Sequence, residues 1–150
     1  MKNIKILFYK SHEDAKMPEY GTEHSAGADI FSIVDAVIAP GHTVIIPTGL
    51  LPIIPIGYKI SVAPKSGLSS KTKMRLSNAP GTIDSDYRGE MGVIIDNIGQ
   101  IPIHIDKGQK IAQIFVEEVI KISPVEIDEK HHSSLKTDRG DGGYGSTGLK

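Results

Sequence analysis

Hydrophobic residues in this chain recur at every second position, within short segments that glycine and proline separate. Ile101, Ile103 and Ile105 alternate with other residues, and Ile60 and Val62 do the same. Alternation with a period of two predicts β-strands that bury one face. Strands are predicted on this basis at residues 2–9, 28–33, 43–50, 58–64, 91–96, 101–106 and 110–120.

Turn-forming residues such as Pro40-Gly41 and Pro80-Gly81 fall between these segments. Many short strands joined by such turns are typical of a sandwich or jelly roll, so we expect an all-β fold. Only Ser66–Thr72 is predicted to be helical. Hydrophobic content falls sharply from His131 onward, which predicts a domain at residues 1–130 and a mobile C-terminal arm at residues 131–150.

Composition narrows the class of protein. The chain has 150 residues, of which 39% are hydrophobic and 23% charged, as expected for a single globular domain. It has no cysteine, no signal-peptide core and no apolar run of the ~18 residues that a membrane span needs, so we expect a cytoplasmic protein, or one of the host-cell cytoplasm or nucleus if it is viral. Its net charge of −1 and its few aromatic residues disfavour polymeric nucleic acid as a partner but allow a nucleotide.

The segment GTIDSDYRGEMG (residues 81–92) places polar groups between a Pro-Gly turn and an apolar strand, which predicts a hairpin. Asp84 and Asp86 have two interpretations here. Both are turn-forming residues, since aspartate makes local hydrogen bonds in turns. Alternatively, one is a general base that aligns a water molecule, with Tyr87 as a flat wall beside a sugar or base.

Lys65, Ser66 and Gly67 stand where the predicted helix begins, in APKSGLSSK (residues 63–71). The N–H groups of a helix N-terminus can bind an anion, although Ser66 is equally well explained as an N-cap. The glycine-dense tail, residues 138–150, carries groups suited to phosphates and a flat ring. It lacks the lysine of a Walker A motif.

Two strands contain isolated polar residues: Asp29 in AGADI (residues 26–30) and Gln113 in KGQKIAQIF (residues 107–115). The Gln113 amide needs a hydrogen-bond partner, from either the protein or a ligand. His131 and His132 have no spaced acid or cysteine beside them, which favours a solvated loop over a metal site.

In their order along the chain, these five motifs resemble those of the deoxyuridine triphosphate nucleotidohydrolases (dUTPases), over about residues 20–148. The resemblance implies a distorted jelly roll of the β-clip type and a homotrimer with active sites at subunit boundaries. It also implies that dUTP is hydrolysed to dUMP and pyrophosphate with the help of Mg²⁺. This activity keeps uracil out of DNA and supplies dUMP for dTMP synthesis.

The resemblance also implies roles for individual residues. Asp84 and Gln113 would serve catalysis, Asp84 by orienting the attacking water and Gln113 by contacting the phosphates. Asp29 would hold Mg²⁺ through its water shell, and Tyr87 would pack under the deoxyribose and leave no room for a 2′-hydroxyl. The remaining substrate contacts would come from Lys65, Ser66, Gly67, Asn78, Gly81, Ile83, Met91, Arg139, Gly142, Gly143, Tyr144, Ser146 and Thr147.

Within that set, Asn78 and backbone groups of the segment 81–91 would read uracil. The C-terminal arm would close over a neighbouring subunit's site, with Tyr144 over the uracil. Lys65 replaces the family's usual arginine, so the contact with phosphate loses a planar, two-pronged donor. Tyr144 replaces the family's usual phenylalanine. Asp96 stands where we expect an apolar residue.

Two alternatives share parts of this pattern. The dCTP deaminases have the same fold, but their deaminating glutamate corresponds to Ile94, which cannot shuttle protons. A dUTP-binding regulatory protein with little turnover would need no water-aligning acid, so Asp84 and a complete arm argue for an enzyme.

Overall fold

Strand β10 (Gly92–Asn97) shows how the period-two pattern builds the protein. Val93, Ile95 and Asn97 are buried, whereas Gly92, Ile94 and Asp96 between them are partly exposed. One face of the strand therefore packs on the core and the other stays accessible.

The structure is a computed structural model that describes residues 3–143.

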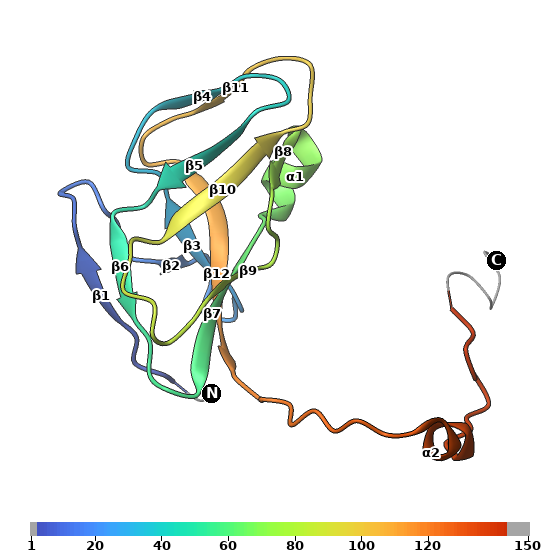
Figure 1. The fold of residues 1–150 in the computed structure, drawn as a ribbon. Coiled ribbons are helices and arrows are strands. Elements are labelled where there is room, and N and C mark those ends of the chain that lie inside the picture. Colours follow the sequence, from blue (N-terminus) through green and yellow to red (C-terminus); the bar gives the residue numbers. More distant parts are fainter. Residues whose placement is uncertain (1–2, 144–150) are drawn as a thin grey trace. The chain divides into compact units, whose positions relative to one another are not determined.

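The strands form four small sheets (Figure 1). The largest has the order β2-β3-β12-β7-β9 and the next β5-β10-β8; β1 pairs with β6, and β11 with β4. The other elements are β1 (Leu7–Lys10), β2 (Glu19–Tyr20), β3 (Ala28–Phe31), β4 (Ala36–Ile38), β5 (Thr43–Pro47), β6 (Leu50–Ile53), β7 (Tyr58–Ala63), α1 (Ser66–Lys71), β8 (Met74–Leu76), β9 (Gly81–Ile83), β11 (Ile103–Ile105), β12 (Lys110–Glu118) and α2 (Glu129–Ser134).

Isoleucine dominates the core that these sheets enclose. The fully buried side chains include Ile30, Ile38, Ile46, Ile60, Ile95, Ile105 and Ile111. β-branched side chains suit strands because the pleated surface accommodates their restricted rotamers. The prediction of an all-β fold is confirmed.

Two strand predictions need correction. Residues 43–50 form two strands, because Gly49 adopts a left-handed conformation (φ +67°) that ends the extended path. Within the described residues 3–9, the strand begins only at Leu7, and β1 continues to Lys10.

The predicted hairpin at residues 81–92 is also wrong. β9 pairs with β7, with Val62 opposite Gly81, whereas β10 pairs with β5 and β8. The segment between β9 and β10 is therefore a loop that crosses from one sheet to another.

The expectation of a single helix is wrong as well, because α2 follows the sheets. Its N-cap, Asp128, accepts a hydrogen bond from the His131 backbone N–H at 2.7 Å, a capping interaction that favours a helix even in a polar segment. The chain divides into two compact units, Met1–Ile120 and Lys121–Lys150. The helix belongs to the second unit.

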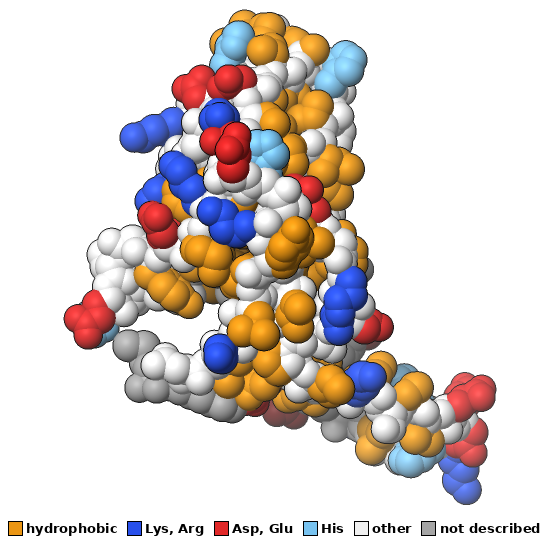
Figure 2. Space-filling view, turned by 90° about the vertical axis from the view of Figure 1, so that its left-hand side faces the viewer, with side chains coloured by type: hydrophobic (Ala, Val, Ile, Leu, Met, Phe, Trp, Pro, Cys, Tyr) orange, Lys and Arg blue, Asp and Glu red, His pale blue; other side chains and the backbone are white. Residues whose placement is uncertain are grey.

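Charges of both signs are interspersed on the face that bears β1 (Figure 2). Exposed apolar side chains of β1 and β6, among them Leu7, Tyr9 and Ile53, lie on the same unit. The described side chains of this face form no continuous basic stripe. Within residues 3–143, no helix has the length and apolar character needed to cross a membrane.

Candidate active site

Six of the predicted site residues, one catalytic and five substrate-binding, line one pocket of about 260 Å³, here called the loop pocket. The pocket lies where the loop after β9 meets β8 and β10. The six residues are Asn78, Gly81, Ile83, Asp84, Tyr87 and Met91.

Gly81 gives the Asn78 side chain its place in the loop pocket. A Cβ atom at Gly81 would lie 3.3 Å from Asn78 Nδ2 and 3.4 Å from the Cβ of Val62. Glycine therefore lets the amide lie close against β9, where it has little freedom to turn.

The backbone of Met91 is already engaged by the protein. Its N–H donates to the Leu50 carbonyl at 2.8 Å, and its carbonyl accepts from Thr48 Oγ1 at 2.5 Å. Because the N–H is occupied, only the second lone pair of the carbonyl is open to a ligand.

Tyr87 is held against its own loop. Its hydroxyl donates to the Glu90 carbonyl at 2.9 Å, and a Cβ atom at Gly89 would come within 2.4 Å of that hydroxyl. The ring is 44% exposed, so it forms a fixed and accessible wall of the loop pocket.

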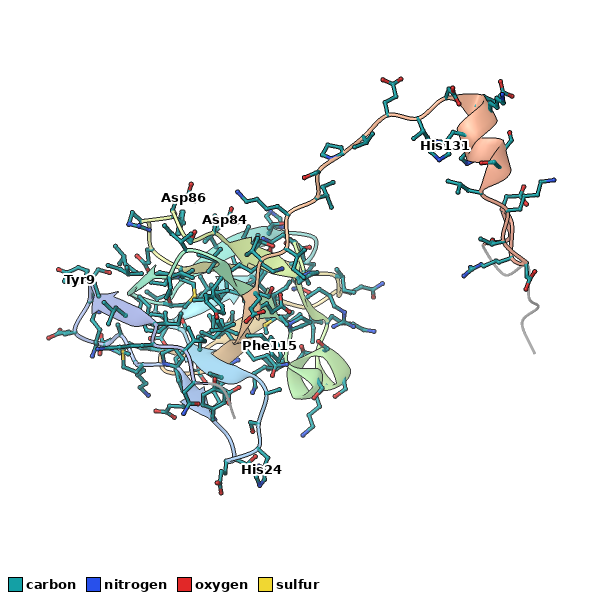
Figure 3. All side chains as sticks on the ribbon, turned by 90° about the horizontal axis from the view of Figure 1, so that it is seen from below. Tyr9, His24, Asp84, Asp86, Phe115 and His131 are labelled. Carbon is teal, nitrogen blue, oxygen red and sulfur yellow. The ribbon has the colours of Figure 1, made fainter. Side chains whose placement is uncertain are left out.

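Asp84 and Asp86 occupy the same loop but differ in position (Figure 3). Asp84 lines the loop pocket, and its carbonyl accepts a hydrogen bond from the Tyr87 N–H at 3.1 Å. Asp86 is exposed and does not line the pocket. The backbone of Asp84 takes part in a turn, and of the two acids only Asp84 lines the pocket, while its role as a general base stays a prediction.

Glu90 is a pocket residue that the sequence did not single out. Its Oε1 accepts a hydrogen bond from the Gly49 N–H at 2.7 Å, which ties the loop to the turn between β5 and β6. No local signal identifies this role, because the partner lies 41 positions away.

Asp29, Lys65 and Gln113 line a second pocket of about 380 Å³, here called the lysine pocket. Gln113 lies opposite both Asp29 and Ala63 in the sheet. Its Nε2 donates to the Pro64 carbonyl at 3.0 Å, so the protein satisfies that end of the amide. A Cβ atom at Gly27 would lie 2.6 Å from Gln113 Oε1, which explains why glycine precedes β3.

Asp29 is only 6% exposed and binds two lysines. Lys65 Nζ pairs with its Oδ1, and Lys110 Nζ lies 2.8 Å from its Oδ2. Burial raises the pKa of the Asp29 carboxyl, but the hydrogen bonds and charges of Lys110 and Lys65 outweigh burial and hold that pKa below its ordinary value. The carboxylate is therefore ionised at neutral pH.

A single carboxylate with both oxygens ion-paired does not form a direct metal site. Within residues 3–143, no group of three or more His, Cys, Asp and Glu side chains is placed to hold a metal ion. Mg²⁺ keeps several waters and often binds through one carboxylate together with substrate phosphates. Asp29 fits a contact with Mg²⁺ through the water shell of the ion.

The interpretation of Ser66 as an N-cap is wrong. Ser66 is the first residue of α1, and Lys65 occupies the cap position without a side-chain hydrogen bond to the helix. Ser66 and Gly67 are exposed, and a Cβ atom at Gly67 would meet no atom of the described residues within 4 Å. Packing within the chain therefore does not require this glycine.

The arm residues Arg139, Gly142 and Gly143 lie in the unit Lys121–Lys150. Arg139 Nε donates to the Gly142 carbonyl at 2.8 Å, and the Gly142 N–H donates back to the Arg139 carbonyl at 3.1 Å. Tyr144, Ser146 and Thr147 lie outside the described residues.

His131 and His132 are exposed, as predicted, but they lie in α2 and not in a loop. Asp96 also has a clear environment. It accepts a hydrogen bond from Thr43 Oγ1 at 2.6 Å and another from Ser77 Oγ, so a partly exposed acid of β10 is joined to β5 and to the turn after β8.

Comparison with known proteins places this geometry among nucleotide hydrolases. The family model described as dUTPase matches residues 13–148. A deoxyuridine 5′-triphosphate nucleotidohydrolase of Hydrogenobaculum sp. is 42% identical over 98% of this chain and 100% of its own. One from Alkaliphilus metalliredigens is 41% identical over the full length of both chains.

Solved structures agree with these relatives. The dUTPase of Staphylococcus bacteriophage 80alpha with dUPNHPP is 27% identical, with a TM-score of 0.84 over 98% of this chain and 100% of its own. A variant of the dUTPase from phage phi11 of S. aureus, described with a structural Mg(II) ion, is 27% identical, with a TM-score of 0.75 over 84% of this chain and 98% of its own. The expectation of a jelly-roll type of fold is thereby confirmed.

Proposed function

The chain belongs to the dUTPase family, and on that premise we propose how it hydrolyses dUTP to dUMP and pyrophosphate. The observation that carries the proposal is the loop pocket, in which Asp84, Asn78 and Tyr87 converge. Uracil enters this pocket, and the triphosphate extends from it.

Asn78 reads uracil together with backbone groups of β9 and the carbonyl of Met91. An amide and peptide groups can mirror the hydrogen-bonding edge of a base. Tyr87 packs under the deoxyribose, where its fixed ring leaves no space for a 2′-hydroxyl.

Asp84 orients the water that attacks the α-phosphorus and accepts its proton as the bond forms. The exposed carboxylate has no hydrogen bond to another described side chain, so it is available to a water molecule. Gln113, Ser66, Gly67 and Lys65 bind the phosphates, and a positioned cation stabilises the charge that develops there. Mg²⁺, when bound through its water shell near Asp29, would offset further phosphate charge.

We also propose that the protein is a homotrimer whose active sites are shared between copies. The predicted uracil- and water-binding residues line the loop pocket, whereas Asp29, Lys65 and Gln113 line the lysine pocket. This separation supports active sites that are shared between copies. The arm, with Arg139, Gly142, Gly143, Tyr144, Ser146 and Thr147, closes over the nucleotide of a neighbouring copy. In the cell, this activity keeps uracil out of DNA and provides dUMP for dTMP synthesis.

Ile94 disfavours deamination. The position of the deaminating glutamate in dCTP deaminases is an aliphatic residue here, and it lines the loop pocket. The carboxylate of Glu90 in the same pocket already accepts the Gly49 N–H.

The decisive experiment is pyrophosphate release from dUTP, dCTP, dTTP and UTP in the presence of Mg²⁺. We expect a strong preference for dUTP, because the wrong base leaves buried polar groups unpaired. Release of ammonia from dCTP would contradict the proposal. So would tight binding of dUTP without pyrophosphate release.

A further inference from the structure

An irregularity of β12 brings the side chain of Lys110 to Asp29, an acid that lines the lysine pocket. The register between β12 and β3 shifts between Lys110 and Ala112. In a regular strand, Lys110 and Gln113 would face opposite sides of the sheet, because they are an odd number of positions apart. A bulge inserts one residue and turns the side chain to the other face, so Lys110 reaches Asp29 beside Gln113.

Phe31 supports this placement. Lys110 lies opposite Phe31 in the sheet, and its ammonium is 5.9 Å from the centre of the ring. Lys110 has a side chain 46% exposed, compared with 25% for Lys65. Lys110 is therefore a solvent-accessible cation that is held in place by Asp29 and Phe31.

The three ion-paired groups Lys65, Lys110 and Asp29 carry an excess of one positive charge among themselves. Without Lys110, Lys65 and Asp29 would form a neutral pair, and the positive charge of Lys65 would be offset by the buried carboxylate. A buried carboxylate is costly to leave unpaired, so Lys65 would be retained by Asp29 and not released to another anion.

We propose that Lys110 is a positioning residue of the phosphate site, which balances Asp29 and so leaves Lys65 free to neutralise the phosphates of the nucleotide. The inference rests on the proposed function and adds a residue to it. Lys110 acts through Asp29 and need not touch the substrate.

The test measures binding of dUpNHpp, in which an imido group replaces the bridging oxygen of the scissile bond, in the presence of a metal chelator. Lys110→Met and Lys110→Gln should each weaken binding at least about tenfold, because the site loses its net positive charge. Lys110→Arg should bind as the wild type does, since it retains the charge. Binding of deoxyuridine, which has no phosphate, should be unchanged in all three.

A double variant distinguishes action through Asp29 from direct contact. If Lys110 balances Asp29, Asp29→Asn added to Lys110→Met should restore dUpNHpp binding, because the neutral amide no longer competes for Lys65. If Lys110 binds phosphate directly, the double variant would stay as weak as Lys110→Met, which would overturn the inference.

Lys107→Met is the matched control. Lys107 lies three positions before Lys110 and pairs with a different acid, Asp14, at 2.7 Å. Its removal should leave dUpNHpp binding unchanged. Equal binding by the wild type and Lys110→Met, or an equal loss for deoxyuridine, would refute the role of Lys110 and leave the proposed function intact. A wild-type protein that does not bind dUpNHpp would instead refute the proposed function.

Discussion

Asp84 and Asp86 test the proposed chemistry at the scale of single residues, because they are the same type of residue two positions apart on one loop. We expect Asp84→Asn to retain dUpNHpp binding and to lower kcat by ~10²–10⁴, the range for loss of a general base. Asp86→Asn should have little effect, because Asp86 is not among the residues that line the loop pocket. A raised KM with unchanged kcat in Asp84→Asn would make Asp84 a binding residue.

Asp96 gives a residue-scale prediction about stability. Hydrogen bonds from Ser77 and Thr43 hold the pKa of the Asp96 carboxyl below its ordinary value. A carboxyl with a lowered folded-state pKa stabilises the protein above its unfolded pKa and loses that contribution as the pH falls through the folded value.

Asp96→Asn should therefore lower Tm at pH 7, and the difference from the wild type should shrink as the pH falls below about 4. Thermal unfolding measured between pH 7 and pH 3 provides the check. Asp106→Asn is the control, since the Asp106 carboxylate has no hydrogen bond within the described residues. A difference in Tm that is constant with pH would mean that Asp96 acts through packing alone.

At the scale of elements, the loop between β9 and β10 acts as a rigid support for Tyr87. Gly89→Ala should displace the ring, because the new Cβ atom would lie 2.4 Å from its hydroxyl. We expect kcat/KM for UTP to rise relative to dUTP, as the barrier to a 2′-hydroxyl is lost.

Gly21→Ala is the control for that loop variant, since its Cβ atom would meet Ser25 Oγ at an ordinary 3.7 Å. Its ratio of UTP to dUTP turnover should equal that of the wild type. If Gly89→Ala also kept the wild-type ratio, the ring would not be what excludes the 2′-hydroxyl.

At the scale of the whole molecule, the prediction concerns exchange of the arm between copies. Asp84→Asn and a chain truncated after Thr137 should each be inactive alone. Unfolded and refolded together in equal amounts, they should recover roughly one site in four, because a site works when its acid comes from the truncated chain and its arm from the point variant.

Mass measurement must show that the refolded mixture contains trimers of both chains. Activity near zero in such trimers would mean that the arm serves its own chain. The tail residues Arg139 to Thr147 would then complete a site in cis.

The sequence by itself was sufficient for features that depend on neighbouring positions. The period-two segments predicted an all-β fold, and the five motifs indicated the family and six of the residues that line the loop pocket. Side-chain alternation and turn chemistry are local properties of the backbone, so they can be read without knowing which strands pair.

Tertiary structure alone decided which distant residues meet. The pairing of β9 with β7 turned a predicted hairpin into a crossing loop, and Asp96 found its partners in Thr43 of β5 and in Ser77 of the turn after β8. Lys110 reached Asp29 because a bulge reversed the facing of one side chain. Strand pairing and register depend on the sum of contacts over the whole core, and no short stretch of sequence contains that information.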